Sequence, residues 1–262
     1  MNSGGLSMTS FALKLIAVLS MLLDHLFQAG LFGQKQLMDW FGLSMGASYY
    51  VCQIIEPLGR LAFPIYAYFI AEGCRHTRSR RNYLLRLLFF GVISEFPYDI
   101  AMNPFHQGGA WYMAFTPFTH LNVFFTLALG VIGITLYDRL RVKGKPAALC
   151  YLPLAACAVA AELLRTDYMI FGPLLIFAAY FPRTTKTRFA AMAGVLALIY
   201  LGYYTGWFSY FDISAPIYLA AACAALGLLA LYNGRRGPKL KWLFYAVYPA
   251  HLTLYMLLKL AQ

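Results

Sequence analysis

Charged residues are scarce in this sequence, and their scarcity argues against an ordinary water-soluble domain. Asp, Glu, Lys and Arg together make up 12% of the 262 residues, about half the share of a typical soluble protein. Hydrophobic residues make up 61% and form long runs separated by short connectors. We therefore expect an integral membrane protein.

Acidic residues are the scarcest charged class. The chain has 21 Lys and Arg against 10 Asp and Glu, which gives a formal net charge of +11. These basic residues lie in short connectors and form no single soluble face, so we expect no nucleic-acid partner. Membrane lipids are the partner that the composition predicts.

The sequence also lacks the short motifs that mark common metal and catalytic sites. It has no HExxH, HxH, GxSxG or Walker A motif, and no GxGxxG in a suitable context. The five cysteines contain no CxxC pair, and we interpret them as packing residues. We accordingly expect no metal site.

The first apolar run, residues 11–32, lacks a basic n-region and a clear cleavage site, and it is longer than the h-region of a signal peptide. We interpret it as a retained transmembrane helix. The chain as a whole predicts an all-α, polytopic bundle of about nine spans, forming a single domain over residues 1–262. The expected spans are 11–32, 51–73, 82–101, 119–138, 147–164, 168–181 (short, and re-entrant as an alternative), 188–204, 214–232 and 241–260.

The basic residues alternate between connectors. One set of alternate connectors holds four groups: Arg75, Arg78, Arg80 and Arg81; Arg139, Arg141, Lys143 and Lys145; Arg183, Lys186 and Arg188; Arg235, Arg236, Lys239 and Lys241. The other set holds only Lys35 and Arg165. Cytoplasmic loops carry the excess of Lys and Arg, so we expect a cytoplasmic N-terminus. The two longest outer connectors, 33–50 and 102–118, are predicted to be packed caps or lids.

Several ionisable or strongly polar residues lie within or at the ends of these spans. Such groups are costly in the bilayer and usually face a bundle interior or a wet cavity. A rise of about 1.5 Å per residue places most of them in the outer half of the membrane. We expect one polar chamber there, formed by Asp24, His25, Arg60, Glu95, Asp99, His120, Asn122 and His251.

Purely structural roles are an alternative to the hypothesis of one polar chamber. Glu95 and Asp99 share a helix face and could form a simple polar patch. Arg60 could be a structural ion-pair partner, and His251 a hydrogen-bonded core histidine. Asp24 and His25 are consecutive, so their side chains point about 100° apart and only one can face the reacting atoms.

A segment dense in basic residues, from Glu72 to Arg81, lies at the end of the second span. Membrane topology alone explains the excess of basic residues there. Guanidinium groups also bind phosphates through two parallel hydrogen bonds, so this rim is a candidate anion site as well.

Nine segments, taken in their order along the chain, carry a family resemblance. They are Leu13-Lys14-Leu15-Ile16-Ala17, Met21-Leu22-Leu23-Asp24-His25, Leu58-Gly59-Arg60-Leu61-Ala62-Phe63-Pro64-Ile65, Glu72-Gly73, His76-Thr77-Arg78, Tyr83-Leu84-Leu85-Arg86-Leu87, Ser94-Glu95-Phe96-Pro97-Tyr98-Asp99, Asn122-Val123-Phe124-Phe125-Thr126 and Phe244-Tyr245-Ala246-Val247-Tyr248-Pro249-Ala250-His251-Leu252. In these segments and their order, the sequence resembles the TraX family over nearly the whole chain. The resemblance implies an acetyltransferase of the bacterial inner membrane, since the type member is linked to N-terminal acetylation of conjugative pilin. It also implies cytosolic acetyl-CoA as donor, and leaves the acceptor open among small molecules, peptides and glycans.

With that implication, we assign roles to the polar residues. His25 is the expected general base, because an imidazole titrates near neutral pH. Asp24 would orient a neighbouring group, and Arg60, His120 or Asn122 would stabilise the oxyanion. We expect acceptor binding by Glu72, Glu95, Asp99 and His251, and binding of the acetyl-CoA phosphates by Arg75, His76, Arg78, Arg80, Arg81 and Arg86. The alternative is a proton-coupled transporter or channel that uses the same groups, although the chain shows no inverted repeat.

Overall fold

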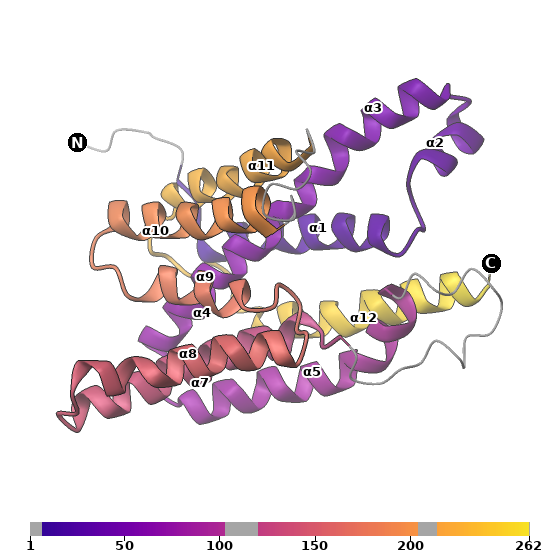
Figure 1. Ribbon diagram of the computed structural model, residues 1–262. Coiled ribbons are helices and arrows are strands. Elements are labelled where there is room, and N and C mark those ends of the chain that lie inside the picture. The colour runs from indigo at the N-terminus through magenta and orange to yellow at the C-terminus, as the bar shows by residue number, and fades with distance from the viewer. Residues whose placement is uncertain (1–6, 103–119, 204–213, 262) are drawn as a thin grey trace. The chain divides into compact units, whose positions relative to one another are not determined.

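The computed structural model describes residues 7–102, 120–203 and 214–261, and this part of the chain is all-α (Figure 1). Nine helical segments predicted from the sequence correspond to helices or to broken helices. The helices are α1 (Ser10–Gln28), α2 (Gln34–Phe41), α3 (Met45–Ile55), α4 (Ala62–His76), α5 (Arg80–Met102), α7 (Val123–Val142), α8 (Ala147–Leu163), α9 (Phe171–Tyr180), α10 (Thr185–Ala197), α11 (Ser214–Ala230) and α12 (Lys241–Leu260).

Several of these helices suit a membrane. Four segments of the described residues are long and apolar enough to cross one: Ser10–Gln28, Met45–His76, Val123–Val142 and Lys241–Leu260. Helices α8, α9 and α11 are shorter and also apolar. The all-α class is therefore confirmed and the apolar helices fit a multi-pass membrane protein, while the count of nine spans and the cytoplasmic N-terminus stay predictions.

Two segments differ from the sequence-based expectation. The connector 33–50 is largely helical, since it contains α2 and the start of α3. The second span begins earlier than expected, at Met45, and is interrupted by a 3₁₀ segment, Glu56–Leu61. Pro57, at the start of this segment, lacks a backbone N–H and removes one hydrogen bond from the helical ladder there. The connector 102–118 lies, except for its first residue, outside the described residues.

The chain divides into two compact units, each built from two separate stretches. Unit 1 contains residues 1–66 and 196–247, and unit 2 contains residues 67–195 and 248–262. Helices α4, α10 and α12 each contribute residues to both units. The expected single domain over residues 1–262 stays a prediction.

Side chains that begin helices explain several boundaries. The Thr9 hydroxyl accepts a hydrogen bond from the Ala12 backbone N–H at 3.2 Å, and Ser44 caps α3 in the same way. Asn122 caps α7 by accepting from Phe124 N–H at 3.0 Å. Each cap satisfies a backbone donor that the first helical turn leaves without a partner.

In unit 2, α7 packs against α8 and α9 (Figure 1). Glycines permit this approach, because a Cβ on Gly130 would lie only 2.5 Å from Ile176 Cδ1. At one end of these helices, the Thr126 hydroxyl donates to the Asp167 carbonyl at 2.5 Å. The α8–α9 connector is thereby held against the start of α7.

The basic connectors gather at the other end of unit 2. Arg80 at the start of α5 pairs with Asp138 near the end of α7, at 2.7 Å. Tyr180 at the end of α9 donates to the same carboxylate at 2.6 Å. In unit 1, Ser10 at the start of α1 likewise donates to the Arg236 carbonyl, at 3.0 Å. Helix ends that adjoin the basic connectors thus meet within unit 2, and the cytoplasmic location of these connectors stays a prediction.

Candidate functional site

Three clusters of polar side chains stand out in the described residues. The Asp24 cluster lies in unit 1 and contains Asp24, His25, Gln28, Glu56, Arg60 and Tyr218. The Glu95 cluster lies in unit 2 and contains Glu95, Asp99, Asn122, Tyr248 and His251. The Glu72 cluster, at the basic end of unit 2, contains Tyr68, Glu72, Arg75, His76, Tyr180 and Arg188.

In the Asp24 cluster, a buried ion pair joins α1 to the 3₁₀ segment. Arg60 Nη2 lies 3.3 Å from Asp24 Oδ1, and the two side chains are 10% and 9% exposed. Gln28 donates to the other carboxylate oxygen at 2.8 Å, and Glu56 lies 4.0 Å from the same guanidinium. The Tyr218 ring of α11 stacks on Arg60, with the guanidinium carbon 5.2 Å from the ring centroid. Removing one partner of such a pair leaves an uncompensated buried charge, which is strongly destabilising.

The 3₁₀ segment approaches α1 unusually closely. A Cβ on Gly59 would lie 2.6 Å from Asp24 Cβ, so only glycine leaves room for the acid at this point. One turn earlier on α1, the Ser20 hydroxyl donates to the Leu58 carbonyl. Such irregular backbone at membrane depth is tolerated where it is buried in protein or lines a cavity.

His25 follows Asp24 on α1 and is itself buried, with 6% of its surface exposed. It follows directly on the acid whose carboxylate pairs with Arg60. The cluster therefore combines a base, an acid and a fixed cation away from water. Electrostatic interactions are stronger in such surroundings than in solution, which suits acid–base chemistry.

In the Glu95 cluster, Asn122 holds Glu95 in place. Its side-chain amide donates to Glu95 Oε2 at 2.5 Å and to the Gly91 carbonyl at 2.8 Å. Its backbone N–H donates to Glu95 Oε2 as well, at 3.2 Å. Both amide hydrogens of Asn122 are therefore used inside the protein. Asn122 therefore contacts Glu95 and caps α7, and its oxyanion role stays a prediction.

Two carboxylate oxygens of this cluster, one on Glu95 and one on Asp99, are buried and available to accept hydrogen bonds. Neither Glu95 Oε1 nor Asp99 Oδ2 has a hydrogen-bond partner among the residues that the structure describes. Tyr248 of α12 lies against the start of α7, with its ring 5.0 Å from that of Phe124. The His251 ring lies 5.3 Å from the Tyr248 ring and is buried. His120, by contrast, is exposed and precedes α7.

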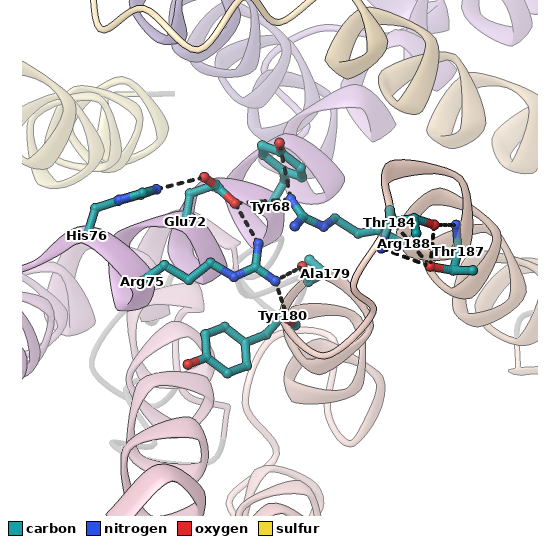
Figure 2. Close-up of polar contacts among 9 residues, drawn as sticks. All are labelled: Tyr68, Glu72, Arg75, His76, Ala179, Tyr180, Thr184, Thr187 and Arg188. Atoms are coloured by element: carbon teal, nitrogen blue, oxygen red, sulfur yellow. Dashed lines mark hydrogen bonds and ion pairs between the residues drawn. The ribbon is translucent and has the colours of Figure 1, made fainter.

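Figure 2 shows the Glu72 cluster, in which one carboxylate meets two arginines and a histidine. Glu72 Oε1 lies 2.7 Å from Arg75 Nη1 and 3.0 Å from Arg188 Nη1. Glu72 Oε2 lies 3.3 Å from His76 Nε2. These contacts join α4 to α10, and Arg75 extends them to α9 by donating to the Tyr180 carbonyl. Glu72 pairs with basic residues here, and its expected role in acceptor binding stays a prediction.

The expected phosphate-binding residues divide into two groups. Arg75 and Arg80 are engaged by acids of the chain, since Arg80 pairs with Asp138. The Arg86 guanidinium stacks on the Tyr83 ring at 5.8 Å. Arg78 and Arg81 are exposed and present positive charge to the solvent or to the membrane surface, and the exposed His76 contacts Glu72.

The structure thus brings together some of the predicted residues. Asp24 meets Arg60, and Glu95 meets Asn122, but these pairs belong to different units. The expected single chamber for all eight residues stays a prediction. Sequence analysis assigned no role to Gln28, Tyr180, Tyr218 or Tyr248 and treated Arg188 only as a topology signal. Gln28 had a usable signal, because it lies four residues after Asp24 on one helix face.

Comparison with known proteins gives two matches. A family model described as TraX protein matches residues 10–259. A relative from Dichelobacter nodosus, named probable fimbrial assembly protein FimC, serogroup H1, is 31% identical over 261 residues, and the alignment covers 96% of each chain. No solved structure matches this chain.

Proposed function

Because this chain belongs to the TraX family, we propose that it is a membrane acetyltransferase that moves an acetyl group from cytosolic acetyl-CoA to an acceptor at the outer side of the membrane. The observation that carries this proposal is the buried group formed by Asp24, His25 and Arg60. Burying an acid, an imidazole and a guanidinium together in apolar helices is costly. A catalytic role accounts for that cost.

In this proposal His25 is the general base. The acceptor nitrogen or oxygen attacks the thioester carbonyl carbon, and His25 removes the proton that the attacking atom loses. The C–S bond then breaks, and the coenzyme A sulfur leaves with a proton. Asp24 acts through Arg60, because its carboxylate accepts hydrogen bonds from Arg60 and Gln28.

Arg60 is the proposed oxyanion donor. Asp24 and Tyr218 hold its guanidinium in one orientation, so little reorganisation is needed when charge develops on the carbonyl oxygen. His120 and Asn122 are the weaker candidates. The first is exposed, and the second already donates both of its amide hydrogens to Gly91 and Glu95.

Glu95 and Asp99 are the proposed binding groups for a cationic acceptor. Each has a buried carboxylate oxygen without a hydrogen-bond partner in the described part of the chain. An ammonium group would supply both charge and donors to these oxygens. The Dichelobacter nodosus relative is named a fimbrial assembly protein, so a pilin-like peptide with a free N-terminus is the first acceptor to test. His251 is proposed to line the same region.

At the cytoplasmic side, the exposed residues His76, Arg78 and Arg81 are proposed to attract the phosphates of acetyl-CoA. A long, thin pantetheine arm could then carry the thioester into the bundle. Binding would weaken as salt rises, because interactions between exposed charges are screened at physiological ionic strength.

Purified, detergent-solubilised protein tests this proposal directly. The protein is incubated with acetyl-CoA and a panel of peptides, amines and sugars, and free coenzyme A is followed. We expect release with at least one acceptor, lost by 10²-fold or more in His25→Ala, which is the usual range for a general base. Lys35→Ala, an exposed change on α2, is the matched control and should keep full activity.

A wild-type protein that neither binds acetyl-CoA nor releases coenzyme A would contradict the enzyme. Proton flux into proteoliposomes that requires Glu95, in a protein without transferase activity, would favour the transporter alternative. The buried carboxylates of the Glu95 cluster suit that function as well.

A further inference from the structure

Two guanidinium groups of the Glu72 cluster converge on a single oxygen atom. Arg75 Nη1 lies 2.7 Å and Arg188 Nη1 lies 3.0 Å from Glu72 Oε1 (Figure 2). The position of this oxygen is therefore a point at which any anionic oxygen would accept hydrogen bonds from two arginines. Convergent guanidinium groups of this kind are a common way to bind phosphate.

Both arginines are held in place without help from Glu72. The Arg75 guanidinium lies 5.1 Å from the Tyr180 ring centroid, and that of Arg188 lies 5.4 Å from the Tyr68 ring centroid. Arg75 also donates to the Tyr180 backbone carbonyl, and Arg188 to the Tyr68 hydroxyl at 3.3 Å. The two groups are thus already oriented, which lowers the entropic cost of binding a ligand.

The charges of the cluster do not balance. A single carboxylate faces Arg75 and Arg188, and His76 lies on its second oxygen at 3.3 Å. Arg188 Nε is buried and has no hydrogen-bond partner within the described residues. Glu72, Arg75 and Arg188 keep 19%, 23% and 14% of their side-chain surface exposed, so a solute can reach them.

We propose that Arg75 and Arg188 form a binding site for a phosphate ester, and that Glu72 is a built-in competitor which occupies the site when no ligand is bound. An incoming phosphate oxygen takes the place of Glu72 Oε1, and Glu72 keeps its contact with His76. Under the proposed function, on which this inference rests, the ligand is the nucleotide end of acetyl-CoA. A phospholipid head group has the same chemistry.

The test measures binding of adenosine 3′,5′-diphosphate to the full-length protein in detergent by calorimetry. Glu72→Gln removes the competing charge and keeps the side-chain shape, so we expect binding about 5- to 10-fold tighter. Arg188→Gln removes one of the two guanidiniums and should weaken binding at least about 10-fold. Arg188→Lys keeps the charge without the fork and should fall between this variant and the wild type.

Matched controls separate a specific site from general electrostatics. Asp39→Asn removes an exposed acid on α2, and Arg183→Gln removes an exposed arginine from the connector that precedes α10. Both should leave the dissociation constant within about twofold, because exposed charges at a distance are screened. Circular dichroism and gel filtration check the fold of each variant. If Arg188→Gln does not fold, the nucleotide affinity of Glu72→Gln still tests the proposal.

The outcomes are distinct. Tighter binding of the nucleotide or of the lipid by Glu72→Gln supports the inference, and unchanged or weaker binding of both ligands overturns it. A parallel titration with nanodiscs containing phosphatidylglycerol identifies the ligand source: a Glu72→Gln gain seen only there supports a lipid site and excludes the nucleotide. Since no acetyl transfer is measured, an inactive protein that still shows the Glu72→Gln gain contradicts the proposed function and not the site.

Discussion

Individual side chains in this protein are held by contacts that leave little freedom to substitute them. Gly59 shows this most clearly, because its missing Cβ makes room for Asp24. Glycine here serves close approach of two backbones and not a left-handed turn, since the positive-φ glycines lie elsewhere in the described residues. The Asp24–Arg60 pair therefore depends on a residue that carries no functional group.

Gly59→Ala should displace Asp24 and disturb its pairing with Arg60. We expect a loss of about 1–3 kcal/mol in the free energy of unfolding, as for other overpacked sites, measured by thermal unfolding in detergent. Gly227→Ala on α11 is the control, because a Cβ there meets nothing within 4 Å. An equal effect of both substitutions would show that the Gly59 contact is relaxed in solution.

Asn122 makes a second prediction at this scale. Asn122→Ala removes the α7 cap together with the side-chain donor to Glu95 and leaves buried acceptors without partners. The expected cost is about 1–3 kcal/mol, again from thermal unfolding. Asn82→Ala, an exposed substitution near the start of α5, should change stability by less than about 0.5 kcal/mol. A neutral Asn122→Ala would rule out the supporting role.

At the scale of the helices, α5, α7 and α9 are joined by three side chains. Arg80, Asp138 and Tyr180 meet with Arg80 Nη2 at 2.7 Å from the carboxylate and the tyrosine hydroxyl at 2.6 Å. Arg80 also donates to the Cys74 carbonyl at the end of α4, at 3.1 Å. An arginine expected to bind phosphate is thus an internal link between helix ends.

A double-mutant cycle on Arg80→Ala and Asp138→Ala measures this link. We expect a coupling energy of about 0.5–1.5 kcal/mol, because the pair is partly buried and charge-assisted. A control cycle on Lys143→Ala and Asp138→Ala, in which Lys143 is an exposed residue, should give a coupling energy near zero. A coupling near zero for both cycles would mean that the pair contributes nothing to stability.

The helices could be predicted from the sequence far better than their interruptions. Long apolar runs determine that a helix forms, and most predicted spans lie within a few residues of a real one. The 3₁₀ segment Glu56–Leu61 and the π-helical turn Leu198–Tyr203 depend on local hydrogen-bond register, which hydropathy does not report. Helix α2 was missed because its run of eight residues is short and polar.

The same limit applies to the polar clusters. Counting residues along a helix gives the depth of Glu95 or Arg60, but it does not give the direction in which the side chain points around the axis. The sequence therefore predicted which polar residues are energetically costly to bury, and it left open which of them pair with one another. Arg188 shows the consequence, since its position in a basic connector suggested topology alone and its contact with Glu72 was not foreseen.

For the whole molecule, the central expectation is that basic connectors share the cytoplasmic side. Single cysteines placed at Lys143, Arg183 or Lys239 in a cysteine-free background should resist a membrane-impermeant maleimide in intact cells. Cysteines at Lys35 or Arg165 should react, because these residues lie on the other set of connectors. The five native cysteines have to be replaced first, since all are free thiols. Reaction from the opposite side at either set would reverse the topology.

The most direct test of the whole account uses sealed inside-out membrane vesicles that contain the protein and an acceptor peptide in their lumen. Radiolabelled acetyl-CoA is added outside, where the cytoplasmic face is exposed. We predict label on the luminal peptide, absent with His25→Ala and retained with Lys35→Ala. Label on the peptide only when acetyl-CoA and peptide are on the same side, or no label at all, would contradict transfer of an acetyl group across the membrane.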